Sequence, residues 1–291
     1  MKIIMAGTIP LSQPDDLTVK DNATEMEIFI RDKTKLGRLY SFFEKRGIEK
    51  YGHINPFVII DSGAFSWNKE TMHSMGAASA SLPDPKIHLR NLIEFIRQNA
   101  EKPYVFVELD IYRTLPKKLI DEAYDEIKSI KGNFKIIRVY HHILDNGDLS
   151  QLKKWIDEGQ TYIGLGPSTA FLFKKIFNLT KNTIKYHYFA GTTIQFLLDF
   201  PFYTADSTTY LCSQRYGNVF YIEDFIKMKS IRYTEKINLC HDLLDPFLFK
   251  EKDGGIAINR KNMMRRNILI FDYFQQIITN LWKERGVEWN D

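Results

Sequence analysis

The sequence predicts an α/β fold of the (β/α)8 type, a TIM-like barrel, built as a single domain over residues 1–291. Short apolar runs alternate with longer amphipathic segments, which is typical of βαβ units and a parallel sheet. Several apolar runs end in a carboxylate, a histidine pair or a glycine-rich turn, and the length of 291 residues suits a barrel. Because periodicity does not report closure, an open doubly wound sheet is the alternative.

Apolar runs of strand length and helical spacing of apolar residues define the expected elements of the first half. A proline opens the helix expected at 85–98, where its missing N–H does no harm. We expect strands at 2–5, 57–60, 104–109 and 134–140, and helices at 85–98 and 119–130.

The second half continues the alternation to about residue 210. We expect helices at 149–158, 168–178 and 193–200, and strands at 161–163, 184–189 and 201–205. The core is therefore expected over 1–222, followed by a basic and helical C-terminal part over 223–291. In that part the amphipathic segment 267–283 is predicted to be a helix that closes the barrel.

Composition excludes several classes of protein. With 44% hydrophobic and 14% aromatic residues the chain can bury a full core. Two cysteines, Cys212 and Cys240, provide no disulfide framework and no Cys-x-x-Cys metal pair. The N-terminal segment lacks the features of a signal peptide, and no stretch approaches the roughly 20 apolar residues of a membrane helix. We expect a cytoplasmic protein without a membrane partner, and the net charge of +4 permits nucleic-acid binding without showing it.

Three carboxylates follow expected strands directly, namely Asp61, Asp110 and Asp206. In a βα barrel the carboxyl ends of the strands meet on one face, so these side chains should share a pocket. Neighbouring carboxylates raise one another's pKa, so that one acts as an acid while an ionised one attacks a sugar carbon. Glycosyl transfer needs this pairing. Asp61 and Asp206 could instead cap the helices or turns that follow them.

The turn Gly164-Leu165-Gly166 offers backbone without side chains, against which a flat purine can lie. A carboxylate such as Asp110 can accept hydrogen bonds from the N1–H and the amino group of guanine. An ordinary tight turn is nearly as good an interpretation of the glycines. His187 is open to interpretation as a core histidine.

The segment Asp61-Ser62-Gly63-Ala64-Phe65 resembles the Asp-Ser-Gly-Gly-Phe/Tyr signature of tRNA-guanine transglycosylases. Segment 160–166 (QTYIGLG) is similar to their glycine-rich base-binding turn. Segment 187–211 (HYFAGTTIQFLLDFPFYTADSTTYL) resembles the family's strand and helix before the nucleophilic aspartate. The similarity is greatest to the short phage branch that inserts 7-deazaguanines into DNA. The resemblance covers about residues 57 to 211.

The resemblance implies a guanine transglycosylase in which Asp206 is the nucleophile on the sugar C1′ and Asp61 is the general acid/base. It implies no cofactor and no metal, a 7-deazaguanine such as preQ0 as the incoming base, and protection of DNA from restriction as the purpose. His142 is an alternative to His141 as a contact of the base. The expected substrate-binding residues are Ser62, Gly63, Phe65, Asp110, His141, Gly164, Leu165, Gly166 and Gly191.

One departure bears on the nucleic acid. The tRNA enzymes carry a Cys-x-Cys-x-x-Cys…His zinc site near the C-terminus, and such a site needs four ligands. Cys240, His241 and the distant Cys212 cannot supply them, so the expected partner is DNA, with tRNA as the alternative. The same residues also fit a nucleoside hydrolase, or a barrel that binds nucleic acid without catalysis.

Two basic segments after residue 222 are candidates for phosphate contacts, although runs of Lys and Arg are more often solvated surfaces. The sequence makes no prediction about the oligomeric state. The expected phosphate-binding residues are Lys227, Lys229, Arg232, Arg260, Lys261, Arg265 and Arg266.

Overall fold

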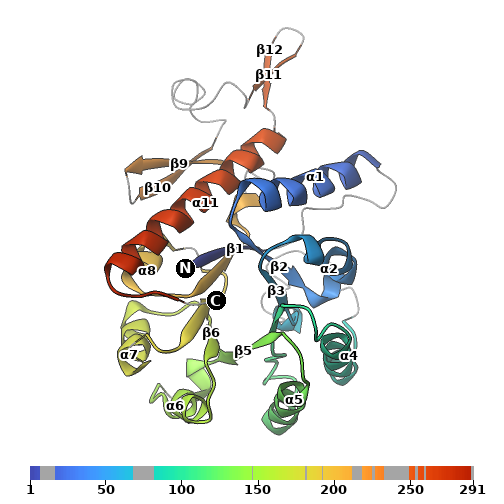
Figure 1. Ribbon diagram of the computed structural model, residues 1–291, viewed down its shortest axis with the longest axis vertical. Helices are drawn as coiled ribbons and strands as arrows, with labels where there is room; N and C mark the ends of the chain where they lie inside the picture. Colours follow the sequence, from blue (N-terminus) through green and yellow to red (C-terminus); the bar gives the residue numbers. More distant parts are fainter. Residues whose placement is uncertain are drawn as a thin grey trace.

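Eight parallel strands form a closed barrel in the order of the chain, with helices around its outside (Figure 1). The sheet closes where β1 pairs with β8, with Ile4 opposite Asp206, which excludes the open-sheet alternative. The computed structural model describes residues 1–6, 17–67, 82–145, 147–180, 182–191, 193–211, 218–224, 227–232, 249–252, 255–258 and 260–289.

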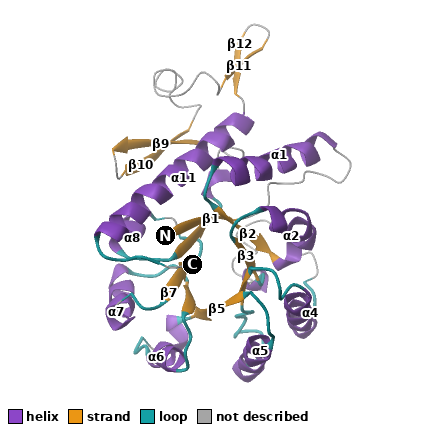
Figure 2. Ribbon diagram, viewed as in Figure 1, coloured by secondary structure: helices purple, strands orange, loops and turns teal. Residues whose placement is uncertain are grey.

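Alternation of strand and helix, as predicted, organises the chain from β1 to β8 (Figure 2). Each predicted strand lies within a few residues of an observed one. The strands are β1 (Lys2–Ala6), β2 (Gly37–Ser41), β3 (Val58–Asp61), β4 (Val105–Val107), β5 (Lys135–Tyr140), β6 (Tyr162–Leu165), β7 (Lys185–Tyr188) and β8 (Thr204–Ser207).

The helices of the barrel follow the predicted segments as closely. Helix α4 begins at the predicted proline, and the Asp84 carboxylate before it accepts hydrogen bonds from the N–H groups of Lys86 and Ile87. The main helices are α1 (Leu17–Lys33), α2 (Lys45–Tyr51), α4 (Pro85–Gln98), α5 (Lys117–Ser129), α6 (Ser150–Asp157), α7 (Ala170–Thr180), α8 (Ile194–Asp199) and α11 (Arg260–Glu284). Short 3-10 turns are η1 (Phe42–Glu44), η2 (Gly52–Ile54), η3 (Ala64–Trp67), η4 (His142–Asp145) and η5 (Thr209–Leu211).

Sequence patterns did not reveal strand β2 or its flanking helices α1 and α2. The strand reads Gly-Arg-Leu-Tyr-Ser, which lacks an apolar run, because its second residue is Arg38, a charged residue that is buried as one half of an ion pair. The Arg38 guanidinium donates to both carboxylate oxygens of Glu27 on α1, at 2.8 and 3.0 Å, and to the Met5 carbonyl at 2.6 Å. A charged residue therefore occupies a position that patterning reserves for an apolar one.

The C-terminal part supplies the helix that covers the barrel after β8. Helix α11 starts at Arg260, earlier than the predicted 267, and contacts β1, α1 and α8 (Figure 1). Gln275 on α11 accepts a hydrogen bond from the Ile3 N–H at 2.5 Å, which ties the helix to β1. The expected boundary at residue 222 falls within strand β9 (Asn218–Asp224). This strand pairs antiparallel with β10 (Lys227–Arg232), and β11 (Phe249–Lys252) pairs with β12 (Gly255–Ile258).

Apolar side chains from strands all around the barrel pack together inside it. Ile4, Leu39, Ile59 and Val105 belong to this interior cluster, which makes the barrel a packed core rather than a pore. No helix in the described part of the chain is long and apolar enough to cross a membrane.

The Glu27–Arg38 pair gives a test of the fold. Glu27→Gln leaves a buried guanidinium without its counter-charge, so the free energy of unfolding in urea should fall by about 3–5 kcal/mol. Glu94→Gln breaks the half-exposed Glu94–Arg97 pair on α4 and should cost less than about 1 kcal/mol. Equal losses in the two variants would contradict the structural role given to the buried pair.

Candidate active site

The carboxyl ends of the strands bring the predicted acidic residues to one end of the barrel. Asp61 is the last residue of β3, Asp110 follows β4, and Asp206 lies in β8. The negative charges of Asp110 and Asp206 both contribute to the pKa of Asp61, so the three carboxyls share one electrostatic environment. This is the convergence that the order of strands and carboxylates predicted.

Asp61 has the properties of a proton donor and acceptor near neutral pH. Burial of the carboxyl raises its pKa to about 7, and the charges of Asp110 and Asp206 contribute to this rise, against a hydrogen bond that opposes the shift. That hydrogen bond comes from the Gly63 N–H to Asp61 Oδ2 at 3.1 Å. A group with this pKa is present in both protonation states at pH 7, which suits general acid/base work.

Among the described residues, the contacts to the Asp206 carboxylate are all made to one of its two oxygens. Its Oδ1 accepts from the Ala190 N–H at 2.8 Å and lies 3.2 Å from His187 Nε2. Ala190, whose N–H makes this contact, has a positive φ of 47°, an uncommon conformation for alanine. Among the described residues, none donates a hydrogen bond to Oδ2. The contacts to Oδ1 therefore fix the orientation of the carboxylate.

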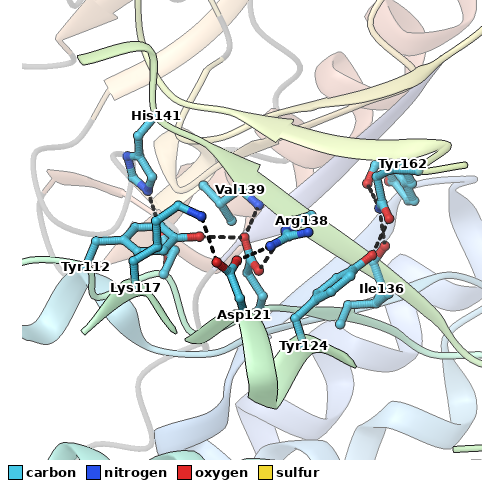
Figure 3. Close-up of polar contacts among 12 residues, drawn as sticks. Tyr112, Lys117, Asp121, Tyr124, Ile136, Arg138, Val139, His141 and Tyr162 are labelled. Carbon is cyan, nitrogen blue, oxygen red and sulfur yellow. Dashed lines mark hydrogen bonds and ion pairs between the residues drawn. The ribbon is translucent and has the colours of Figure 1, made fainter. Parts of the chain in front are cut away.

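Asp110 and His141 form a pair beside these residues. His141 Nε2 lies 2.7 Å from Asp110 Oδ2. The Tyr112 ring packs against His141 in a T-shaped arrangement (Figure 3). The His141 side chain is 39% exposed, whereas that of Asp110 is 14% exposed. Solvent therefore reaches the pair from the histidine side, and Oδ1 of Asp110 remains without a hydrogen bond from the described residues.

Another acidic residue, Glu108, follows β4 directly and contacts β5. It accepts a hydrogen bond from the Val139 N–H at 2.7 Å and faces Arg138, whose guanidinium lies over the rings of Tyr124 and Trp155. Arg138 also pairs with Asp121 on α5 (Figure 3). Burial raises the pKa of Glu108 to about 8. These contacts join β4 to β5 outside the barrel and so support the loops that carry Asp110 and His141.

The glycines of the site make room for aromatic rings of the protein itself. A side chain at Gly63 would overlap the Phe43 ring, one at Gly164 the Phe189 ring, and one at Gly191 the Tyr188 ring. Gly166 differs, since nothing lies within 4 Å of the position that a Cβ would take. Leu165 is buried, and its carbonyl accepts from the Phe189 N–H at 2.9 Å. Of the predicted turn, Gly166 is thus the residue with open space beside it.

The loop after Asp61 is held from behind by a histidine that sequence reasoning missed. His88 on α4 lies with Nε2 2.8 Å from the Ser62 carbonyl and stacks on Phe43, with Trp67 at its edge. Ser62 is fully buried, and its hydroxyl makes no hydrogen bond among the described residues. The position of His88 on the apolar face of the predicted helix was the available signal. The side chain of Phe65 lies outside the described residues.

The predicted phosphate-binding residues lie on β10 and α11. Arg265 is half-exposed and reaches Glu25 on α1 at 3.3 Å, and its guanidinium lies over the Phe29 ring. Arg266 is half-buried. Their role in binding phosphate stays a prediction. The side chains of the others lie outside the described residues: Lys227, Lys229, Arg232, Arg260 and Lys261.

Metal ligands are a separate question. Among the described side chains, no group of three His, Cys, Asp or Glu residues could hold a metal ion. Cys212, Cys240 and His241 lie outside the described residues.

Compared with known proteins, the chain matches no protein-family model and no curated protein.

The raised pKa of Asp61 predicts how stability depends on pH. Between about pH 4 and 7 the folded protein keeps this carboxyl protonated while the unfolded chain ionises it, so its contribution to stability falls as pH rises. Asp61→Asn removes the ionisable carboxyl and therefore removes this loss of stability with rising pH. The variant should become more stable than the wild type as pH rises from 4 to 7, by at most about 4 kcal/mol.

Urea unfolding of both proteins across this pH range measures the difference. Glu108 titrates in both proteins, so its contribution cancels. Asp125→Asn, on the exposed face of α5, is the matched control and should track the wild type. A difference between Asp61→Asn and the wild type that does not change with pH would show that the carboxyl is ionised in the folded state throughout.

Proposed function

We propose that this protein is a transglycosylase that replaces guanine in DNA with a 7-deazaguanine through a covalent aspartyl-sugar intermediate. The observation that carries the proposal is the pair of carboxyls, Asp61 and Asp206, in one electrostatic environment at the carboxyl end of a barrel. Burial and neighbouring charge give Asp61 a pKa of about 7, while Asp206 presents one oxygen without a hydrogen bond from the described residues. Two acidic residues with different environments suit two different roles.

The first step is displacement of guanine. Oδ2 of Asp206 forms a bond to the sugar C1′ as the bond from C1′ to guanine N9 breaks, and the electron pair of that bond leaves with the base. Protonated Asp61 gives its proton to the departing guanine. The product is an ester between Asp206 and the sugar, which is the kind of intermediate that a carboxylate nucleophile forms.

The second step reverses these roles. The ionised Asp61 takes the proton from the ring nitrogen of the incoming 7-deazaguanine, and that nitrogen attacks C1′. The bond from C1′ to Asp206 breaks, and its electron pair returns to the carboxylate. A carboxyl with a pKa near 7 suits both steps, since it must donate in one and accept in the other.

Asp110, His141 and Gly166 lie where they can select the base. Oδ2 of Asp110 is engaged by His141, which leaves Oδ1 to accept a hydrogen bond from the N1–H or amino group of guanine. The open space beside Gly166 leaves its backbone accessible. Selection by a carboxylate favours guanine and 7-deazaguanines, which share this donor edge, over adenine.

DNA is proposed as the nucleic acid because of what the sequence lacks. The tRNA enzymes of the family that it resembles use a four-ligand zinc site, and two cysteines with His241 cannot form it. Extrusion of a base costs a few kcal/mol, which contacts to phosphate must offset. The basic residues of β10 and α11 are proposed for those contacts.

The nucleophile can be tested directly. Asp206→Asn should abolish exchange of labelled guanine into DNA and the covalent protein–DNA adduct seen by denaturing electrophoresis and mass spectrometry. Asp61→Asn should lower kcat by about 10²–10⁴-fold, the usual value of a general acid/base. Asp125→Asn on α5 should leave exchange unchanged. Full exchange by Asp206→Asn would overturn the mechanism.

The substrate can be tested in parallel assays. We expect incorporation of a labelled 7-deazaguanine into duplex or single-stranded DNA and none into tRNA, measured by mass spectrometry of the released nucleosides. Incorporation into tRNA alone would transfer the proposal to the tRNA class. Release of free guanine without incorporation would identify a hydrolase, and binding without either product would identify a non-catalytic barrel.

A further inference from the structure

We propose that Tyr162, Thr204 and His187 form a relay of positioning residues that holds Asp206 by Oδ1 and favours its release from the sugar ester. This inference rests on the proposed function, because it assigns a role to the residues behind the proposed nucleophile. The resemblance and the sequence patterns assigned none of them a role at the site.

A continuous line of polar atoms runs through the barrel interior to the carboxylate. The Tyr162 hydroxyl lies 2.6 Å from Thr204 Oγ1, which lies 2.8 Å from His187 Nδ1. His187 Nε2 lies 3.2 Å from Asp206 Oδ1. Thr204 and His187 are wholly buried and Tyr162 is 4% exposed, so water does not compete for these bonds. The three residues come from β6, β7 and β8, neighbours in the barrel.

The inventory of protons fixes the direction of the relay. Among the described residues, Thr204 Oγ1 is the one acceptor within reach of the Tyr162 hydroxyl. If Tyr162 donates to Thr204, then Thr204 donates to His187 Nδ1, and His187 Nε2–H donates to Oδ1 of Asp206. The opposite direction would leave the tyrosine proton unpaired and aim a nitrogen lone pair at the carboxylate. The structure therefore assigns His187 the Nε2–H tautomer.

Two donors, His187 Nε2–H and the Ala190 N–H, thus bond to Oδ1 of Asp206. Because both donors bond to Oδ1, Oδ2 is the oxygen that forms the ester bond, and Oδ1 becomes the carbonyl oxygen of the ester. A hydrogen bond to a carboxylate is stronger than one to a neutral ester carbonyl. The donors therefore stabilise the carboxylate that leaves when the incoming base breaks the bond to C1′, so their main effect falls on the second step.

A measurement without substrate tests the relay apart from the proposed reaction. In ¹⁵N spectra of the full-length protein, the His187 ring, assigned by its loss in His187→Gln, should show a protonated Nε2 and an unprotonated Nδ1. Thr204→Ser should keep that pattern, whereas Thr204→Val should shift the Nδ1 resonance because its donor is gone. A protonated Nδ1 in the wild type would overturn the relay whatever the protein does to DNA.

A kinetic measurement tests the consequence. The covalent adduct is formed first, and its decay is followed after addition of guanine. His187→Leu should slow adduct decay about 10-fold or more, as expected for one hydrogen bond to a charged group, and should not slow adduct formation. His187→Gln, whose amide can donate in place of Nε2–H, should restore most of the decay rate.

The outcomes are distinguishable. Equal slowing of both steps in His187→Leu, without rescue by His187→Gln, would reduce His187 to a structural residue and overturn the proposal. If His187→Leu does not fold, the pair Thr204→Val and Thr204→Ser decides in the same assay, since only the valine variant should slow decay. Absence of any adduct in the wild type would count against the proposed function and leave the tautomer measurement to judge the relay.

Discussion

Pairing of β1 with β8 is the constraint on which the site depends. This pairing closes the sheet with Ile4 opposite Asp206 and brings the last strand next to the first. Asp61, from β3, then lies at the same end of the barrel as Asp206, although 144 residues of sequence separate positions 61 and 206. An open sheet would leave β8 remote from β3. Closure of the barrel therefore brings carboxyls from separate strands into one group.

The same pairing of β1 with β8 brings carboxyls of like charge close together. The surroundings of each carboxyl determine how it responds to the repulsion. Asp61 responds by holding its proton to about pH 7, since burial and two neighbouring charges disfavour its ionised form. Asp206 has two donors on Oδ1, and Asp110 has His141 on Oδ2. One residue type thus has three different environments at a single end of the barrel, and the proposed roles of acid, nucleophile and base contact are based on those environments.

Much of this arrangement could be predicted from the sequence, because strands that end in Asp61 and Asp206 carry ordinary apolar patterns. Strand β2 could not, since Arg38 is buried by a partner, Glu27, that only the folded chain brings near. His187 was open to interpretation as a core histidine. It is buried in the core, but its contact with Asp206 depends on the register between β7 and β8. The periodicity of apolar residues identifies helices and strands. Pairs such as Arg38 with Glu27 and His187 with Asp206 depend on tertiary contacts that periodicity does not report.

The glycines show how the same residue pattern can satisfy two physical needs. A glycine at 164 was expected to leave a flat surface for a purine, and in the structure the Phe189 ring lies on it. The Phe189 ring in its present position occupies the space that a purine stacked on Gly164 would need. A base bound here would therefore either lie beside Gly166 or displace the ring. Phe189 packs edge-on against His187, with ring centroids 4.3 Å apart. Movement of Phe189 would therefore remove a packing contact from the histidine that holds Asp206, which links the space for the base to the orientation of the carboxylate.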